Sequence, residues 1–264
     1  MKNTTEFDQD LNPILEIADD SDLQPLVEYL QQKYSEGLTS SEAYKLHAPN
    51  HNAYADLIAK EIREMGGNSV ANAIRMFKGP SYHEIVCDVA NKLKAPYNKN
   101  QSVEEIEDSV LAKVLSTALE KMTSEEKEEL LKSLGDKAGS LNLGGLSSAA
   151  LITLFRAGGF YSYQLTVIIA NQVARTILGT GLTFATNATL TRVMSIVAGP
   201  IGLAVTGIWT AIDLAGPSFK VTIPSVIHIA MLRKKYNSIN CPNCNALITN
   251  PTAKFCSECG HQIQ

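Results

Sequence analysis

Acidic side chains are nearly absent from the second half of the chain. The 264-residue sequence contains 27 Asp and Glu residues, but only Asp213 and Glu258 lie beyond residue 136. The basic residues of this half are isolated until the cluster Arg233, Lys234 and Lys235. This distribution lacks the dense basic stripe of a nucleic-acid-binding protein and favours an apolar partner with an anionic surface. We therefore expect no nucleic acid among the partners.

The first 136 residues show the opposite bias, with 25 acidic and 14 basic side chains. The two halves therefore face different surroundings or each other. The N-terminal stretch MKNTTEFDQDLNPILEIADD is acidic and lacks the apolar segment of a secretory signal peptide. We expect the protein in the cytoplasm, or attached peripherally or integrally to the inner membrane.

Catalytic signatures are also missing. The sequence contains no G-x-S-x-G, Walker loop, dinucleotide fingerprint or H-E-x-x-H motif. His47 and His51 have a metal-compatible spacing, but Pro49 between them indicates a loop and no third ligand is adjacent. Cys87 lies among Val86 and Val89 and is interpreted as a small helix residue rather than a nucleophile. These absences favour a non-enzymatic protein.

Helical periodicity dominates what is present. Hydrophobic residues make up 45% of the chain, which suffices for a packed core. Leu23, Leu26, Val27 and Leu30 recur at helical spacing after a Ser21-Asp22 cap signal. The pattern of residues 103–135 predicts two helices, the second capped by Thr123 or Ser124. A further helix near the end of the chain is predicted to have Pro224 in its first turn and to end in basic residues.

The composition divides the chain into four predicted parts. We expect an N-terminal helical segment at 1–38, an acidic helical domain at 39–138, a hydrophobic helical region at 139–236 and a zinc ribbon at 237–264. The fold class that follows is mainly α: a multi-helical bundle with a hydrophobic region rich in Gly and Ala and a small C-terminal zinc-ribbon module.

The C-terminal segment carries the clearest chemical signal. Two C-x-x-C pairs, Cys241 with Cys244 and Cys256 with Cys259, are separated by eleven residues. Each pair can grip one cation from a tight turn, and two pairs complete a tetrahedron of thiolates. Asn245 and Gly260 follow the pairs and tolerate the left-handed backbone of such turns. The alternatives are redox-active pairs or disulfides.

This segment resembles the zinc-ribbon module found at the ends of bacterial proteins and matches it at all four cysteines. It departs from that pattern at Asn245, where glycine is usual. Because four protein sulfurs leave no open position, we expect one structural zinc ion and no catalytic one, with His261 outside the site. A protein partner is expected to contact the ribbon.

The stretch VMSIVAGPIGLAVTGIWTAI, residues 193–212, has no charge and is long enough to span a bilayer. Its Gly and Thr residues make insertion marginal, and Gln164, Asn171 and Gln172 upstream would be costly against lipid. We therefore favour a hydrophobic hairpin within 157–219, broken at AGPIG, that is buried in the protein or moves between protein and membrane. A permanently inserted multi-span protein is the second interpretation.

Three pieces, EMGGNSVANAIRMFKGPSYHEIVCDVANKLK, LEKMTSEEKEELLKSL and AGPIGLAVTGIWTAIDLAGPSFKVTIPSVIHIAMLRKK, resemble the YaaW family of uncharacterised bacterial proteins. The resemblance covers residues 10–236 and leaves the ribbon as an addition. That family is remotely related to the ubiquinol-cytochrome c chaperones, assembly factors for a membrane respiratory complex. The resemblance implies a helical, non-enzymatic, membrane-linked protein and transfers no catalytic residues.

Two functions fit these observations. The first is a membrane-associated or chaperone-like binding or scaffold protein, with the zinc ribbon for a protein partner and membrane contact through 157–219. The second is a pore-forming or membrane-perturbing effector that uses the 157–219 hairpin. A deep polar pocket in the 47–88 region would instead indicate an enzyme.

Overall fold

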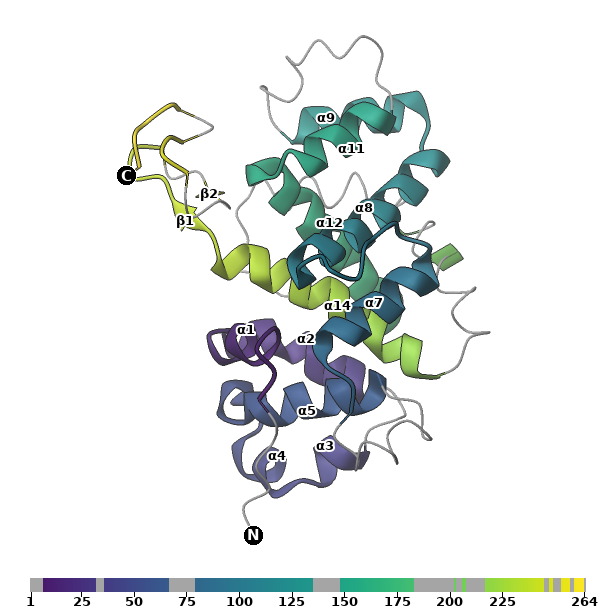
Figure 1. Ribbon diagram of the computed structural model, residues 1–264, viewed down its shortest axis with the longest axis vertical. Helices are drawn as coiled ribbons and strands as arrows, with labels where there is room; N and C mark the ends of the chain where they lie inside the picture. The colour runs from purple at the N-terminus through teal and green to yellow at the C-terminus, as the bar shows by residue number, and fades with distance from the viewer. Residues whose placement is uncertain are drawn as a thin grey trace.

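The protein is mainly helical, as the sequence predicts. The computed structural model describes residues 7–31, 36–66, 79–134, 148–182, 202, 206–207, 217–244, 247–248, 253–256 and 259–263. Its helices form a stack in which the long helix α14 (Pro217–Tyr236) runs between an N-terminal group and a second helical group, and the C-terminal module stands beside them (Figure 1).

The N-terminal group is made of short helices and a 3-10 turn. Its elements are α1 (Asn12–Glu16), α2 (Asp20–Gln31), α3 (Glu36–Ser40), α4 (Glu42–His47), η1 (His51–Tyr54) and α5 (Ala55–Gly66). The predicted stripe on α2 is confirmed, because Leu23, Leu26, Val27 and Leu30 are all buried.

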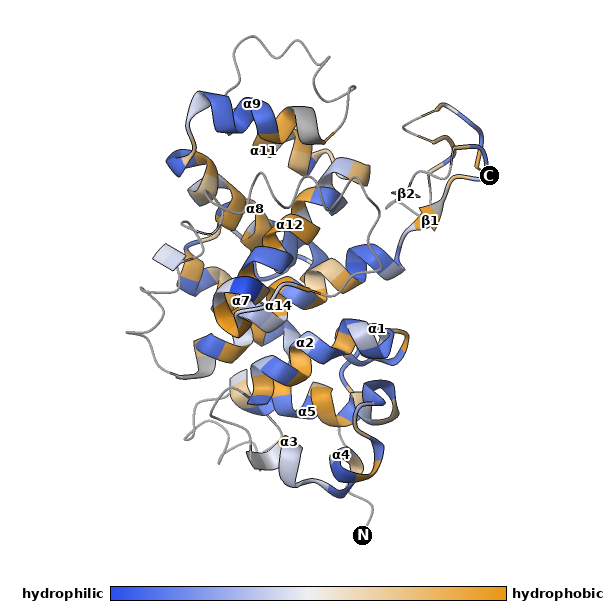
Figure 2. Cartoon of the chain, turned by 180° about the vertical axis from the view of Figure 1, so that it is seen from behind, coloured by the Kyte–Doolittle hydropathy of each residue, from blue (hydrophilic) through white to orange (hydrophobic). Residues whose placement is uncertain are grey.

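The second group contains α7 (Tyr82–Leu93), α8 (Val103–Lys121), α9 (Ser124–Ser133), α11 (Ser148–Arg156) and α12 (Gly159–Leu178). Serine capping boxes start α7 and α8. Thr123, one of the two predicted caps, accepts the Glu126 N–H with its hydroxyl at 3.2 Å and starts α9. Figure 2 shows α12 as largely hydrophobic, α8 with hydrophobic and hydrophilic residues, and α9 as largely hydrophilic, which fits an interior position for α12 and an outer one for α9.

Helix α14 corrects one prediction. Pro224 lies inside this helix rather than in its first turn. Residues 221–232 are buried on every face of the helix, and α14 contacts α1, α2, α5, α7, α8 and α12. Proline removes one backbone hydrogen bond from a helix interior, but packing from all sides keeps this segment helical.

Helix α12 shows why the hydrophobic region carries polar residues. Gln164 and Asn171 are 2% and 3% exposed, and they lie in the protein interior among apolar side chains. The Asn171 Oδ1 atom accepts a hydrogen bond from the Leu182 backbone N–H at 3.0 Å and so fixes the chain after α12. Asn171 therefore has a structural role in the core, and both amides are buried in the protein, as the interpretation of a protein-buried region requires.

Most of the stretch 193–212 lies outside the described residues. At Gly202, a Cβ atom would come within 2.7 Å of the Gln172 Nε2 atom, so the backbone there lies directly against α12. The predicted break at AGPIG lies outside the described residues apart from Gly202. Within the described part of the chain, no helix is long and apolar enough to cross a membrane.

One hydrophobic core extends from Leu11 to Leu232. It contains residues from all three predicted helical parts, while the ribbon has a small cluster of its own. The boundaries near residues 38 and 138 stay predictions, and the helical parts share their core.

The buried imidazole of His228 generates a prediction about pH. Its Nε2–H donates to the Asp22 carbonyl at 2.7 Å, so Nδ1 carries no proton, and Nδ1 has no partner among the described residues. Burial lowers the pKa of His228 to about 4. The unfolded chain binds this proton below about pH 6.5, so folding stability is lost as the pH falls from about 6.5 to 4.

We expect this group to remove about 3 kcal/mol of unfolding free energy across that interval. Urea titrations of wild type and of His228→Gln at pH 7 and pH 4.5 measure it, and the variant should lose less stability between the two. His47→Gln, at an exposed position, is the matched control. Equal losses in wild type and His228→Gln would contradict the assignment.

Candidate metal centre and polar pocket

The four cysteines of the C-terminal module come together in space. Their Sγ atoms lie within 4.8 Å of one another. The Cys241 and Cys259 sulfurs are 3.6 Å apart, and those of Cys244 and Cys256 are 3.7 Å apart. A disulfide bond would require about 2.05 Å. All four are therefore free thiols in an arrangement that can receive one ion.

Two short turns position these sulfurs. Strand β1 (Ile239–Asn240) pairs antiparallel with β2 (Leu247–Ile248), and the first C-x-x-C pair lies in the connection between them. The Cys256 N–H donates to the His261 carbonyl at 2.7 Å, and Gly260 adopts the left-handed conformation expected from the sequence, with φ of 71°. Asn245 lies outside the described residues.

The donor set fits a tetrahedral cation. Four sulfurs at about 2.3 Å from one ion would be about 3.8 Å apart, close to the two separations observed. The Asn243 amide donates to the Cys259 Sγ atom at 3.5 Å, and this bond, together with the His261 backbone N–H and the neighbouring thiols, lowers the pKa of Cys259 to about 6. Four thiolates in this geometry suit zinc and leave no open coordination position.

The described residues of the module form a small hydrophobic cluster. Its buried members are Cys241, Ile248 and Cys256, with Ala253 and Ile263 partly buried against them. Two of these three buried residues are also prospective ligands. A bound ion would therefore supply folding free energy that this cluster cannot.

The other sequence candidates do not form sites. The His51 ring is buried and hydrogen-bonds Gln24 and Tyr54, while His47 is exposed at the end of α4. Cys87 lies 3.7 Å from His83 Nδ1, and burial raises the pKa of its thiol. Among the described residues, no second group of three or more His, Cys, Asp or Glu side chains is close enough to hold a metal.

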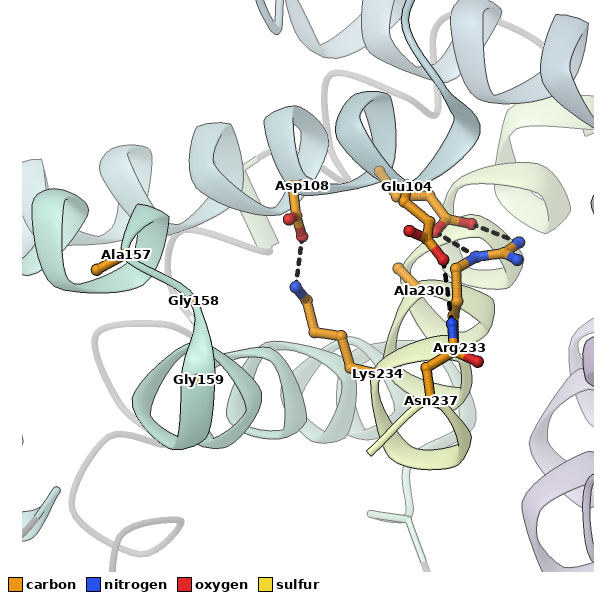
Figure 3. Close-up of a pocket in the computed structure, with 10 residues that line it drawn as sticks. Glu104, Asp108, Ala157, Gly158, Gly159, Ala230, Arg233, Lys234 and Asn237 are labelled. Carbon is orange, nitrogen blue, oxygen red and sulfur yellow. Dashed lines mark hydrogen bonds and ion pairs between the residues drawn. The ribbon is translucent and has the colours of Figure 1, made fainter. Parts of the chain in front are cut away.

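A polar pocket that the sequence did not predict lies where α14 leads into the ribbon. The cavity measures about 310 Å³ and lies between α8, the last turn of α14 and the turn joining α11 to α12 (Figure 3). Acidic residues on α8 face basic residues on α14 across it, and Lys234 Nζ is 2.6 Å from Asp108 Oδ1. None of its lining residues comes from the 47–88 region, in which a deep polar pocket would have indicated an enzyme.

A buried ion pair forms one side of this pocket. Glu107, 2% exposed, accepts from Arg233 Nε at 2.9 Å and from the Tyr82 hydroxyl at 2.8 Å. The Arg233 Nη2 atom also donates to the Asp10 carbonyl at 2.6 Å. Burial raises the pKa of Glu107, and the Arg233 guanidinium opposes that rise. The network ties the N-terminal segment, α7, α8 and α14 together.

The sequence places Arg233 and Lys234 at the negative end of a helix dipole and, with Lys235, in a basic cluster that suits an anionic surface. Their acidic partners lie 126 residues away along the chain, so no local pattern connects them. The sequence feature that could have indicated these ion pairs is an arginine followed by two lysines after an otherwise uncharged stretch.

The fold and the site define a mainly helical protein with a four-cysteine C-terminal module that can hold a metal ion. A family model described as Ubiquinol-cytochrome C chaperone matches residues 50–227. The chain belongs to this family, which is chaperone-like and not a known class of enzyme.

Curated relatives agree with the match and confirm the resemblance to YaaW. A UPF0174 protein of Helicobacter pylori strain J99 is 46% identical over 241 residues, covering 89% of this chain and 94% of the relative. The UPF0174 protein YaaW of Escherichia coli O157:H7 is 32% identical over 189 residues, covering 71% and 74%. No solved structure matches the chain.

The Glu107–Arg233 pair generates a prediction about stability. Arg233→Met would leave the Glu107 carboxylate buried without its cation and should cost about 3 kcal/mol of unfolding free energy. The double variant Glu107→Leu/Arg233→Met should recover more than half of this loss, because neither charge then remains buried. Urea unfolding followed by circular dichroism measures all three proteins.

Lys234→Met is the matched control. It removes the neighbouring pair, in which Asp108 is 48% exposed, and should cost less than about 1 kcal/mol. Equal losses for Arg233→Met and Lys234→Met would show that burial of the pair has no energetic consequence.

Proposed function

We propose that this protein is a non-enzymatic, chaperone-like binding protein that holds a polypeptide client. The match of residues 50–227 to the chaperone family carries the proposal. Two features support the proposal. The first half of the chain is acidic, and the helices pack around the buried residues 221–232 of α14. We place the protein in the cytoplasm, where thiols stay reduced.

The ribbon is proposed to hold one structural zinc ion through Cys241, Cys244, Cys256 and Cys259 and to contact a protein partner. The four-sulfur geometry supports zinc. Phe255 is 60% exposed and Ile239 is 38% exposed on this small module. Exposed apolar side chains on a module that stands beside the helical body (Figure 1) offer a contact surface.

Membrane contact through residues 157–219 also stays a proposal, and it is supported by the low charge of that region, in which Arg175, Arg192 and Asp213 are the charged residues. Helix α12 uses its apolar side chains inside the protein, so we assign the contact to residues beyond Leu182. The described residues offer no observation in favour of a pore-forming effector.

Zinc binding is tested by metal analysis of the purified full-length protein. We expect one zinc ion per chain, lost in Cys256→Ser because three thiolates and a hydroxyl bind zinc far more weakly. Cys87→Ser, which removes a thiol outside the cluster, should keep the metal. Full zinc content in Cys256→Ser would contradict the assignment.

The same samples test what the metal supports. Chelation should disorder the ribbon and leave the helical circular dichroism signal within about a tenth of its starting value, since the main core excludes the ribbon residues. Loss of most of the helical signal would show that the body depends on the metal.

Client binding is tested by light scattering of a chemically unfolded protein diluted into buffer. The full-length protein should suppress aggregation at about equimolar ratio, and Phe255→Ser should require several-fold more protein for the same suppression. Phe7→Ser, which alters a 48% exposed aromatic residue away from the ribbon, is the matched control. Aggregation that is unchanged at a tenfold excess would refute the chaperone-like function.

A further inference from the structure

The pocket beside α14 has more negative than positive side chains. Its lining includes the carboxylates of Glu104, Glu107 and Asp108 and only two cations, Arg233 and Lys234. Arg233 is paired with the buried Glu107, and Lys234 is paired with Asp108. Glu104 instead accepts a hydrogen bond from the neutral amide of Asn237 at 3.0 Å. The pocket therefore has one more acidic side chain than basic side chains, and Glu104 is the acidic residue without a cationic partner in the pocket.

This excess lies where a ligand can reach it. Glu104 is exposed and Asp108 is 48% exposed. The two residues are one helical turn apart on α8, so their side chains are neighbours on the same face of the helix. Figure 3 shows both pointing from α8 toward the last turn of α14. A cation between them would meet two carboxylates.

One wall of the pocket, opposite the charged residues, has little side-chain bulk. It is formed by Ala157, Gly158 and Gly159, and both glycines have positive φ, 77° and 71°. Apart from the adjacent residues, no atom of the described part of the chain lies within 4 Å of a Cβ built on either glycine. An open stretch of main chain without bulky side chains can lie beside a second main chain, as in peptide recognition.

We propose that this pocket binds an extended segment of the client that carries a Lys or Arg side chain. The basic side chain lies between Glu104 and Asp108, and the adjoining client backbone lies along Gly158 and Gly159. This deepens the proposed function and rests on it, because it names the chemistry of the client segment.

Size and charge favour this occupant. A cavity of about 310 Å³ is at the small end of ligand pockets and accommodates one long side chain with its flanking backbone. An anionic ligand would meet three carboxylates, two of them accessible, and two cations that are already paired with carboxylates. The acid excess of the first 136 residues, 25 against 14 basic side chains, also attracts basic segments at long range.

Fluorescence anisotropy with three labelled peptides of equal length tests the proposal. One peptide carries Lys and Arg, one has Gln in their place and one has Glu in their place. The full-length protein should bind the basic peptide at least about tenfold more tightly than the other two, with an affinity that falls as salt rises.

A charge-matched pair of variants separates the pocket from the acidic surface. Glu104→Gln/Asp108→Asn should weaken binding of the basic peptide about tenfold. Glu120→Gln/Glu129→Gln removes the same charge from exposed positions on α8 and α9 and should weaken it less than about twofold. Glu120 is twelve residues from Asp108, about 18 Å along the helix axis.

Glu104→Gln alone keeps the Lys234–Asp108 pair, so it reports on the pocket even if the double variant fails to fold. It should weaken binding about threefold. Equal weakening by the two double variants, or equal binding of all three peptides, would overturn the proposal. If the wild type suppresses aggregation but does not prefer the basic peptide, the pocket assignment fails while the chaperone-like function stands.

Discussion

The burial of α14 on every side is the constraint on which the rest of the structure depends. Residues 221–232 of this helix expose no face to water, so polar side chains on it gain stability from partners in the protein. Arg233 meets Glu107, His228 donates to the Asp22 carbonyl, and Lys235 Nζ lies 2.5 Å from Asp22 Oδ2. These contacts orient α2 and α8 around α14.

The same constraint positions the two candidate sites. The last turn of α14 supplies Arg233 and Lys234 to the polar pocket, and three residues after Tyr236 the chain enters β1 of the ribbon. The pocket and the metal centre are therefore close to each other in the sequence, at the C-terminal end of α14. A client held in the pocket would lie near whatever partner the ribbon contacts, without any long connection between them.

The hydrophobic region illustrates how composition and structure can diverge. Its long uncharged run suggests a bilayer, but α12 buries Gln164 and Asn171 in the core and caps the following turn with the Asn171 side chain. Polar amides are costly in lipid and useful in a protein interior, where a backbone N–H can be satisfied. These amides in the sequence are the reason for interpreting this helix as part of a protein core rather than of a membrane span.

Local and metal-binding features were readable from the sequence alone. Helical spacing predicted the buried stripe of α2, the Thr123 cap predicted the start of α9, and the two C-x-x-C pairs predicted four sulfurs around one point, because each depends on residues close together in the chain. The helical role of Pro224, the Glu107–Arg233 pair and the pocket were decided only by tertiary structure. They depend on helices that are more than a hundred residues apart and are brought together by burial of α14, a non-local effect that no spacing in the sequence records.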